Sequence, residues 1–345
     1  MKVMHVLYSV VFTGAETVVA QIIDSFRQVP EMEMCYCSRE SAIVAQILAQ
    51  RNIRYTPVRN LTPKELKAVI DREKPDLIHA HDMRASFISA LVCGKIPLVS
   101  HIHNNAFDAR GLSPKSIAYL LAGFKAKHII WVSNNAFNGY RFHDLFRDKS
   151  VILKNIIGTQ QIFERKALDT NTYDFDVIYV GRLTYPKDPE RLIRVCARMK
   201  QKKQDVIFGI VGTGELEDAV KELAKELDVE ENVRFLGYQT NPMKMVSDSK
   251  AMVLTSRWEG IPMCALEAMA LGVPVISTPV GGMGDLIDNG VNGYLCAEDE
   301  EIAESLLKIV LDPALRAELS ENTLKKIALI NDENKYREAV EKLYR

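Results

Sequence analysis

Several features that would place the chain in a narrow class are missing from its 345 residues. The six cysteines include no CxxC pair and no metal-ligand spacing, so a cysteine-held metal is not indicated, and this usage fits a reducing cytoplasm better than secretion. No run of about 18 uncharged apolar residues occurs, so no membrane-spanning helix is predicted. Low-complexity segments and repeats with a period of roughly 20 to 50 residues are also absent.

The N-terminal stretch MKVMHVLYSVVF is apolar and allows two interpretations. The first is a signal peptide, but the run is short, has no small-residue cleavage site and leads into TGAETVVAQII, a loop followed by a helical pattern. The second is a buried first strand. The sequence favours the strand, and with it a cytoplasmic location.

Charge is balanced over the whole chain but unevenly distributed along it. The net charge is −1, yet residues 1–155 contain 20 Lys and Arg against 13 Asp and Glu, while the remainder contains 24 against 32. All seven histidines lie in the first half. A basic half suits an anionic partner such as a phosphate, a lipid pyrophosphate or a membrane surface, although a merely solvated surface explains the excess equally well. Halves of opposite charge indicate two domains with different tasks.

Short apolar runs alternate with helical patterns through both halves, which predicts right-handed βαβ units and parallel sheets. The alternation is interrupted by the polar stretch IIGTQQIFERKALDTNTY. We therefore predict an α/β fold of two doubly wound, Rossmann-like domains facing across a cleft, with ligands at the carboxyl ends of the strands. The predicted boundaries are 1–157 for the N-terminal domain, 158–173 for a linker, 174–332 for the C-terminal domain, and 333–345 for a C-terminal helix that could pack back toward the first domain.

Two acidic residues interrupt the apolar segment SRWEGIPMCALEAMALGVPVIS at residues 256–277. An ionised carboxylate in apolar surroundings costs several kcal/mol unless it is paired, so Glu259 and Glu267 each need a partner. Hydroxyl groups of a sugar or a ribose are one kind of partner. Structural pairing with arginines such as Arg257 or Arg182 is the alternative.

The neighbouring loops supply further groups that suit a phosphorylated ligand. Pro262 is predicted as the first residue of a helix that stops at Gly272, and the amides at the start of this helix form an anion site. In VGRLTYPKDPERLI, Arg182 and Lys187 lie between a strand and a helix, where two cations would neutralise a diphosphate. An ordinary solvated loop is the alternative for this pair.

Glycines follow two other predicted strands. Gly212 and Gly214 in VGTGELED allow close approach of backbone to a ligand, but Glu217 stands where a dinucleotide fingerprint has its third glycine, which argues against NAD binding. Gly14 lies at the head of the first helix, where backbone amides suit an anion.

Taken together, these motifs resemble the retaining family-4 glycosyltransferases of the GT-B fold, of the bacterial capsule or cell-surface polysaccharide type. The resemblance covers nearly the whole chain. Its most specific element is the E-x7-E motif of Glu259 and Glu267, followed by AMALGVPVIS and GG...NGVNGYL; the loop at 181–188 and HAHD at 79–82 add to it. Such enzymes hold the nucleotide-sugar donor in the C-terminal domain and the acceptor in the N-terminal domain.

The resemblance implies a role for each motif residue. Glu259, with the amides that follow it, would bind hydroxyls of the donor sugar and take part in catalysis, and Glu267 would bind the ribose. The two cations would hold the diphosphate, and the tyrosine and glutamine after VRFLG would lie near the base. The implied donor-binding set is Gly14, Arg182, Lys187, Gly212, Gly214, Tyr238, Gln239, Glu259, Gly260, Ile261, Pro262, Met263 and Glu267.

A catalytic histidine follows a strand of the first domain in this family, at the position of PLVSHIHNN. The alignment favours His103, and His101 is the rival two residues away on the same face of the strand. Any lone histidine could be a satisfied core residue, but four at two adjacent strand ends favour an active-site role. The candidate acceptor residues are His81, Asp82, His101 and Arg110.

The resemblance implies that no metal and no other cofactor is required. Asp174 and Asp176 spell DxD, the metal motif of the other glycosyltransferase fold, but they precede a strand at the amino edge of the sheet. We interpret them as polar residues of the linker.

We predict a transferase that moves a sugar from a nucleotide diphosphate donor, first of all a UDP-sugar, to a saccharide or polyprenyl-linked acceptor with retention. Helix 113–127, with lysines around an apolar centre, would contact the inner face of the membrane; a core-facing helix with a solvated edge is the alternative. A sugar-nucleotide epimerase of the same fold and a non-catalytic sugar-nucleotide-binding protein are the competing hypotheses. No nucleic-acid partner is expected, because no aromatic-basic motif is present.

Overall fold

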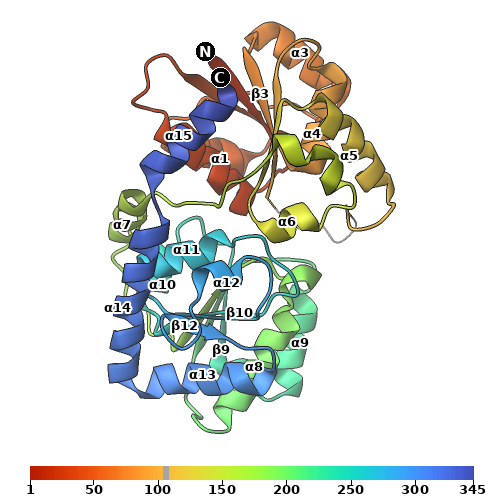
Figure 1. The fold of residues 1–345 in the computed structure, drawn as a ribbon. Helices are drawn as coiled ribbons and strands as arrows, with labels where there is room; N and C mark the ends of the chain where they lie inside the picture. The colour runs from red at the N-terminus through yellow and green to blue at the C-terminus, as the bar shows by residue number, and fades with distance from the viewer. Residues whose placement is uncertain (104–108) are drawn as a thin grey trace. The chain divides into compact units, whose positions relative to one another are not determined.

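The computed structural model describes residues 1–103 and 109–345, and the chain divides into two compact units (Figure 1). Unit 1 contains residues 1–156 and 332–345, and unit 2 contains residues 157–331. Each unit is built on a six-stranded sheet whose strands pair in parallel. The predicted α/β class with two parallel sheets is confirmed.

The sheet of unit 1 is wound in both directions from its first strand. Its strand order is β2-β1-β3-β4-β5-β6. The chain therefore reverses its direction of winding between β1 and β3, which are neighbours in the sheet. The strands are β1 (Lys2–Val6), β2 (Glu33–Cys37), β3 (Leu77–His81), β4 (Leu98–Ile102), β5 (His128–Trp131) and β6 (Ser150–Ile152).

Helices cover both faces of this sheet, with α1 and α15 on one side and α3, α4 and α5 on the other (Figure 1). Local sequence signals determine where a helix begins: Thr62 caps α3 with its hydroxyl, and Pro63 fixes the φ angle of the first helical residue. The helices are α1 (Gly14–Ser25), α2 (Ala42–Gln50), α3 (Pro63–Glu73), α4 (Asp82–Val92), α5 (Pro114–Lys125), α6 (Asn134–Asn138) and α15 (Glu333–Tyr344), with the 3₁₀ segment η2 (His143–Lys149).

The C-terminal helix α15 belongs to unit 1 and packs against α1. The hydroxyl of the buried Tyr344 lies 2.7 Å from Nδ1 of His79 on β3. Residues from the end of the chain therefore complete a core that begins at its first strand.

The sheet of unit 2 repeats the double winding. Its order is β12-β11-β10-β7-β8-β9, so the direction reverses between the neighbours β7 and β10. The strands are β7 (Val177–Val180), β8 (Phe208–Val211), β9 (Val233–Gly237), β10 (Ala251–Leu254), β11 (Val275–Ser277) and β12 (Gly293–Leu295). The helices are α7 (Thr159–Ala167), α8 (Pro189–Lys200), α9 (Glu217–Glu226), α10 (Met243–Asp248), α11 (Met263–Ala270), α12 (Met283–Leu286), α13 (Asp299–Leu311) and α14 (Pro313–Ile330), with η3 (Tyr185–Lys187) and η4 (Glu230–Asn232).

The predicted linker at 158–173 differs from the observed structure, because it contains α7. This helix buries Ile162 and packs against α10 and α11, so it is part of unit 2. Arg165 and Lys166 in its last turn complement the negative end of the helix dipole. The segment carries too few apolar residues for its period to stand out in the sequence.

In the part of the chain that the structure describes, no helix combines the length and the apolar character needed to cross a membrane.

Candidate active site

The candidate donor residues of unit 2 all follow the carboxyl ends of its strands. Arg182 and Lys187 follow β7, Gly212 follows β8, Tyr238 follows β9, and Glu259 follows β10. Because parallel strands end at the same edge of a sheet, these loops meet. Ligands of doubly wound sheets bind at this edge where the winding reverses, which here is between β7 and β10.

An ion pair joins the two loops at that reversal point. Lys187 Nζ donates to Glu259 Oε1, which also accepts from the Ser256 hydroxyl at 2.6 Å. The Glu259 side chain is only 8% exposed and that of Lys187 19% exposed. A carboxylate this buried needs such donors, and the lysine 72 positions earlier in the chain supplies one.

Glu267 on α11 also has a cationic neighbour. The Arg165 guanidinium on α7 lies 3.6 Å from its Oε1 and also donates to the carbonyl oxygen of Thr240 at 3.0 Å. Sequence reasoning missed Arg165, because it lies in the segment interpreted as a linker. The signal that could have found it is a lone arginine at helical spacing from Ile162 within that segment.

The alternative prediction, that these glutamates pair with Arg257 or Arg182, was wrong about which cations are involved. Arg257 binds Asp188 at 3.0 Å and lies 4.5 Å from the centre of the Tyr185 ring. Arg182 is exposed, and no described residue forms an ion pair with its guanidinium. Arg182 is therefore a cation available to an external anion at the end of β7.

The glycines after β8 serve the packing of neighbouring loops. Gly212 has a φ of +134°, and a Cβ there would lie 1.9 Å from the carbonyl oxygen of Gly181; a Cβ on Gly214 would lie 2.2 Å from that of Leu183. Any side chain would push the β8 loop off the β7 loop, which carries both cations. The close approach predicted for a ligand is thus, in this structure, an approach of backbone to backbone.

A second glycine pair supports the loop that contains Glu259. Gly281 has a φ of +61°, and a Cβ there would lie 2.2 Å from the carbonyl oxygen of Glu259. Gly282 donates its amide to the carbonyl oxygen of Gly260 at 2.8 Å. The GG motif after β11 therefore fixes the backbone from Glu259 to Ile261, and it belongs to the site although it was not among the predicted residues.

Helix α11 begins immediately after this loop. Pro262 is its N-cap, with extended dihedral angles, rather than its first helical residue, and no side chain of the described residues caps the helix. Met263 is the first helical residue, and the helix ends before Gly272, whose φ is +73°. Cys264 lies in the first turn, where burial raises the pKa of its thiol to about 12, so the thiol stays protonated.

The residues proposed for the base lie at the end of β9. Tyr238 follows Gly237, whose φ is +63°, and its side chain is 39% exposed. Gln239 donates its side-chain amide to the carbonyl oxygen of Leu236 at 2.7 Å. An exposed aromatic ring at this edge of the sheet is suited to stacking on a base.

The two aspartates of the DxD sequence lie at the opposite edge of this sheet, before β7. Asp176 is buried and accepts from Lys250 at 2.6 Å, from the amide of Ile207 at 3.1 Å and from Lys203 at 3.2 Å. These protein donors account for the Asp176 carboxylate without a metal.

In unit 1, the structure brings together the candidate histidines. His81 Nδ1 lies 2.8 Å from His103 Nε2, and the His101 and His103 rings stack with their centres 4.1 Å apart. Asp82 starts α4 with a φ of +68°, and its Oδ1 accepts from the amide of His103 at 3.4 Å. These four candidates therefore form one group at the ends of β3 and β4.

Burial keeps these histidines neutral. It lowers the pKa of His103 to about 4, although the nearby Glu16 carboxylate acts in the opposite direction, and it lowers the pKa of His81 and His101 well below the ordinary range. Glu16 lies in the first turn of α1 and accepts from the amide and hydroxyl of Thr13 at 2.9 and 2.8 Å. Gly14, the first residue of this helix, follows the end of β1 as predicted.

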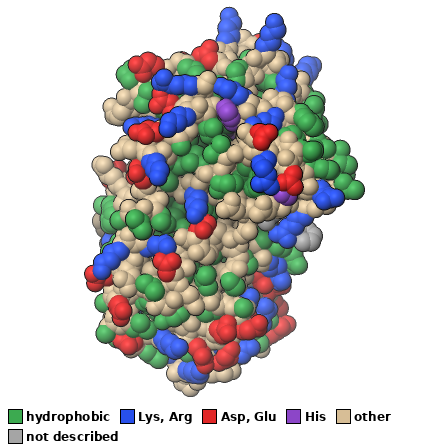
Figure 2. All heavy atoms as spheres, viewed as in Figure 1, with side chains coloured by type: hydrophobic (Ala, Val, Ile, Leu, Met, Phe, Trp, Pro, Cys, Tyr) green, Lys and Arg blue, Asp and Glu red, His purple; other side chains and the backbone are tan. Residues whose placement is uncertain are grey.

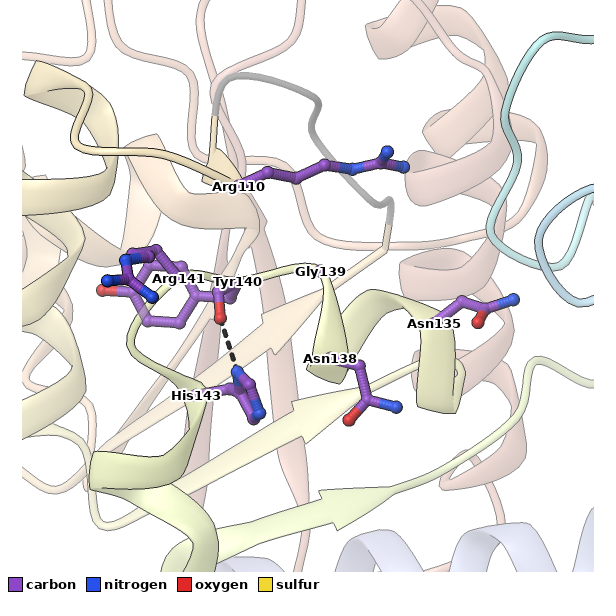
Figure 3. Close-up of a pocket in the computed structure, with 7 residues that line it drawn as sticks. All are labelled: Arg110, Asn135, Asn138, Gly139, Tyr140, Arg141 and His143. Carbon is purple, nitrogen blue, oxygen red and sulfur yellow. Dashed lines mark hydrogen bonds between the residues drawn. The ribbon is translucent and has the colours of Figure 1, made fainter.

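Arg110 does not join this group. It lines a pocket of about 380 Å³ in unit 1, and in Figure 3 its side chain extends along one side while His143 hydrogen-bonds the Tyr140 carbonyl oxygen at 2.7 Å. The lining consists of Arg110, Asn135, Asn138, Gly139, Tyr140, Arg141 and His143. Two guanidinium groups and two amides make it a polar pocket suited to an anionic or hydroxyl-rich group.

Two family models match adjoining parts of the chain. Residues 13–161 match the model described as Glycosyltransferase Family 4, and residues 160–326 match the one described as Glycosyl transferases group 1. The chain belongs to the family-4 glycosyltransferases with the GT-B fold. Together, the matches to the two family models extend over both units of this glycosyltransferase.

Curated relatives include enzymes with named activities. An uncharacterised glycosyltransferase of Methanocaldococcus jannaschii is 32% identical over 239 residues, which are 63% of this chain and 58% of that protein. The N-acetyl-alpha-D-glucosaminyl L-malate synthase of Bacillus anthracis is 25% identical, with 78% of this chain and 74% of the relative covered. The lipopolysaccharide core biosynthesis glycosyltransferase LpsE of Rhizobium meliloti is 29% identical, with 76% and 74% covered.

Solved structures share the fold along the full length of the glycosyltransferase. Anabaena HepE in complex with UDP-glucose superimposes with a TM-score of 0.85 at 22% identity, covering 99% of this chain and 98% of HepE. A point mutant of Staphylococcus aureus TarM, in complex with Fondaparinux, alpha-GlcNAc-glycerol and UDP, gives 0.78 at 13% identity, covering 100% and 99%. At these identities the likeness establishes the fold.

Proposed function

We propose that this glycosyltransferase transfers a sugar from a UDP-sugar to a saccharide or lipid-linked acceptor of cell-surface polysaccharide synthesis, with retention at the anomeric carbon. One observation carries the proposal: the Lys187–Glu259 ion pair lies where the winding of unit 2 reverses, directly before the uncapped start of α11. A cation, a carboxylate and helix amides are what a diphosphate and a sugar diol require together.

In the proposed complex, the ion pair is exchanged for contacts with the donor. Lys187 and the exposed Arg182 bind the diphosphate, while Glu259 accepts hydroxyls of the sugar and Glu267 those of the ribose. As the bond from the anomeric carbon to the phosphate oxygen breaks, the departing diphosphate gains charge beside these cations. Electrostatic stabilisation of that charge by groups already in place is the main catalytic contribution.

The surroundings of the site support retention without a covalent enzyme intermediate. In the proposed complex the Glu259 carboxylate accepts from the sugar hydroxyls and from Ser256, and Cys264 holds its proton. The acceptor hydroxyl would therefore attack the anomeric carbon itself, on the face that the diphosphate leaves, and its proton would pass to the departing diphosphate. From unit 1 we propose His103 as the active-site histidine and Gly14 as a neighbour of the donor phosphates. No metal or other cofactor is required in this mechanism.

The names and bound ligands of similar proteins support the choice of donor and pathway. HepE and TarM have been solved with UDP or a UDP-sugar, and LpsE is named for lipopolysaccharide core biosynthesis. The anionic or hydroxyl-rich groups of a saccharide acceptor suit the polar pocket lined by Arg110, Arg141 and His143.

Helix α5 supports a lipid-linked acceptor. Its outward face is apolar rather than a solvated edge: Ile117, Leu121 and Phe124 are exposed, with Phe124 66% exposed. Figure 2 shows hydrophobic side chains gathered at the edge of unit 1 where Figure 1 places α5. The exposed Lys115 and Lys125 at its two ends suit an anionic lipid surface.

Vesicle sedimentation tests the membrane contact. We expect the protein to bind vesicles containing phosphatidylglycerol and Phe124→Ser to bind them several-fold more weakly. Leu329→Ser removes an even more exposed apolar side chain, 81% exposed, from unit 2 and should change nothing. Equal binding by all three proteins would contradict the contribution of α5.

The donor proposal is tested by thermal unfolding with UDP-, GDP- and ADP-glucose in the presence of EDTA. A ligand that binds only the folded protein adds about 2.7 kcal/mol at a concentration of 100 Kd. We expect UDP-glucose to raise the Tm of the wild type and of the surface control Glu226→Ala, but not of Glu267→Ala.

Three outcomes would overturn the proposal. A Tm that responds to none of the three donors would remove the donor site. Conversion of a UDP-sugar to its epimer without any acceptor would identify an epimerase instead, and binding without turnover on any acceptor would identify a non-catalytic protein.

A further inference from the structure

Five histidines of unit 1 meet on one face of its sheet. Side chains two residues apart point to the same face of a strand, which places His79 with His81 on β3 and His101 with His103 along β4. The register pairs His5 with His79 and His81 with His101, so the three strands bring all five rings together. Every one of these side chains is at least nine-tenths buried.

The three rings nearest the strand ends form the tightest group. The centres of the His81, His101 and His103 rings are 4.1, 5.1 and 5.4 Å apart. One nitrogen from each ring lies within 4.8 Å of one from each of the others. The nitrogen atoms of His81 and His103 are already only 2.8 Å apart.

Hydrogen bonding among the described residues leaves several ring nitrogens without a partner. A neutral imidazole has one donor and one acceptor. His81 uses both, toward His103 at 2.8 Å and His5 at 3.0 Å. Both nitrogens of His101 and Nδ1 of His103 have no partner among the described residues. Unpaired buried polar atoms are expensive, so their presence within a cluster of imidazoles indicates a ligand.

We propose that His81, His101 and His103 bind one divalent transition-metal ion, Zn²⁺ or a related ion that prefers imidazole. Neutral imidazole is the commonest metal ligand, and three of them with one water complete a four-coordinate zinc site. Zn–N bonds of about 2.0 to 2.1 Å set the nitrogens about 3.3 Å apart in a tetrahedron. The His81–His103 separation therefore needs to open by only a fraction of an ångström.

The surroundings favour this trio over His5, His79 and His81. His79 Nδ1 is engaged by the Tyr344 hydroxyl, whereas His101 has both nitrogens available. His103 follows the end of β4 and is the most exposed of the three rings, at 9%. The carboxylates of Glu16 and Asp82 lie close to His103 and offset the charge of the ion.

The site would also act on the transfer reaction, a consequence that rests on the proposed function. The ion would hold the ring of His103, the active-site histidine of that proposal. Since the transfer itself is proposed to need no metal, the ion would inhibit it reversibly, and EDTA would restore the rate.

The binding test needs no sugar substrate. We would titrate Zn²⁺ into untagged, EDTA-stripped protein by calorimetry and record the visible spectrum with Co²⁺. We expect one ion per chain, a Co²⁺ spectrum typical of four-coordination, and a loss of affinity of at least about 100-fold in His101→Leu and His103→Gln, because even changes behind the ligands cost about 10–100-fold. The control His128→Gln, in a histidine outside the cluster, should bind like the wild type.

The outcomes are distinct. If the wild type binds no stoichiometric ion, or if all variants bind it alike, the proposal is wrong and the histidines form only a hydrogen-bonded group. A cooperative urea transition of His101→Leu in the presence of a chelator shows that this variant is folded, so a loss of Zn²⁺ binding in it reports on the site. Failure of the donor test would leave the Zn²⁺ result standing, because the two experiments use different units.

Discussion

Unit 1 places five histidines in or directly after its central strands, whereas unit 2 places lysine, arginine and glutamate side chains in the loops and helices that follow its strands. Both sheets have six strands and both reverse their winding in the middle. The two sheets therefore share one architecture but carry different side chains: unit 1 has neutral imidazoles, and unit 2 has ion pairs.

The difference shows two ways in which a buried titratable group is accommodated. Burial without a charged partner drives the pKa of His101 well below its ordinary range, so the ring is neutral. In unit 2 the charge is kept and paired, as in Lys187 with Glu259. Removing one polar side chain should therefore have opposite consequences for the stability of the two units.

The largest effect is expected at the ion pair of unit 2. In Lys187→Ala, we expect kcat/KM to fall by about 10²–10³, the loss typical of one group that stabilises developing charge. The free energy of unfolding should fall as well, by about 1.5–3 kcal/mol, because Glu259 loses a charged hydrogen bond. Steady-state kinetics and urea unfolding measure the two effects.

Lys244→Ala is the matched control. It removes a lysine of similar exposure from a pair with Asp248 within α10, and the proposed mechanism gives this lysine no role. An equal loss of activity in both variants would show that the Lys187–Glu259 pair has no special role. A Lys187→Ala variant with normal kcat/KM would contradict the donor site directly.

The next effect concerns the glycines that hold the Glu259 loop. In Gly281→Ala, a Cβ would lie 2.2 Å from the carbonyl oxygen of Glu259 at a φ of +61°. We expect a loss of about 2–3 kcal/mol of stability and weaker donor binding, since left-handed backbone alone costs an L-residue about 1–2 kcal/mol. Gly284→Ala, three residues on, has nothing within 4 Å of its Cβ and should be neutral. Equal behaviour of the two variants would remove the argument from loop support.

The smallest expected effect is an increase in the free energy of unfolding, and it concerns unit 1. With a chelator present, we expect His101→Leu to raise the free energy of unfolding by about 1 kcal/mol, because it removes two buried nitrogens that have no partner among the described residues. His81→Leu, which breaks two hydrogen bonds to neighbouring rings, should instead destabilise. Urea unfolding separates the two; a marked loss of stability in His101→Leu would show that ordered water satisfies its ring.

Much of the fold could be predicted from the sequence because short local patterns of residues determine it. The alternation of apolar runs and helical patterns is enough to indicate two parallel sheets, and turns or caps such as Thr62-Pro63 mark where helices begin. The donor loops were also visible, because Arg182, Lys187 and Glu259 each follow a recognisable strand.

What the sequence did not show depends on contacts between distant segments. Glu259 finds Lys187 rather than an arginine because the reversal of strand order makes β7 and β10 neighbours, which no local pattern states. Arg165 was missed because its helix has a short apolar face. His5 joins the histidines of β3 only through the β1–β3 register, so four of the five were noticed and the fifth was not.

Because α15 belongs to unit 1, unit 1 becomes complete later than unit 2 during synthesis. Unit 2 is one continuous segment, so it has all of its residues once Asn331 has left the ribosome, whereas at that point unit 1 still lacks α15. Until α15 is made, Phe26 and His79 in the first 156 residues of unit 1 lack their contacts with Tyr344, which packs against both. Because domains tend to fold as units while they emerge, the segment made first would be the last to reach its final form.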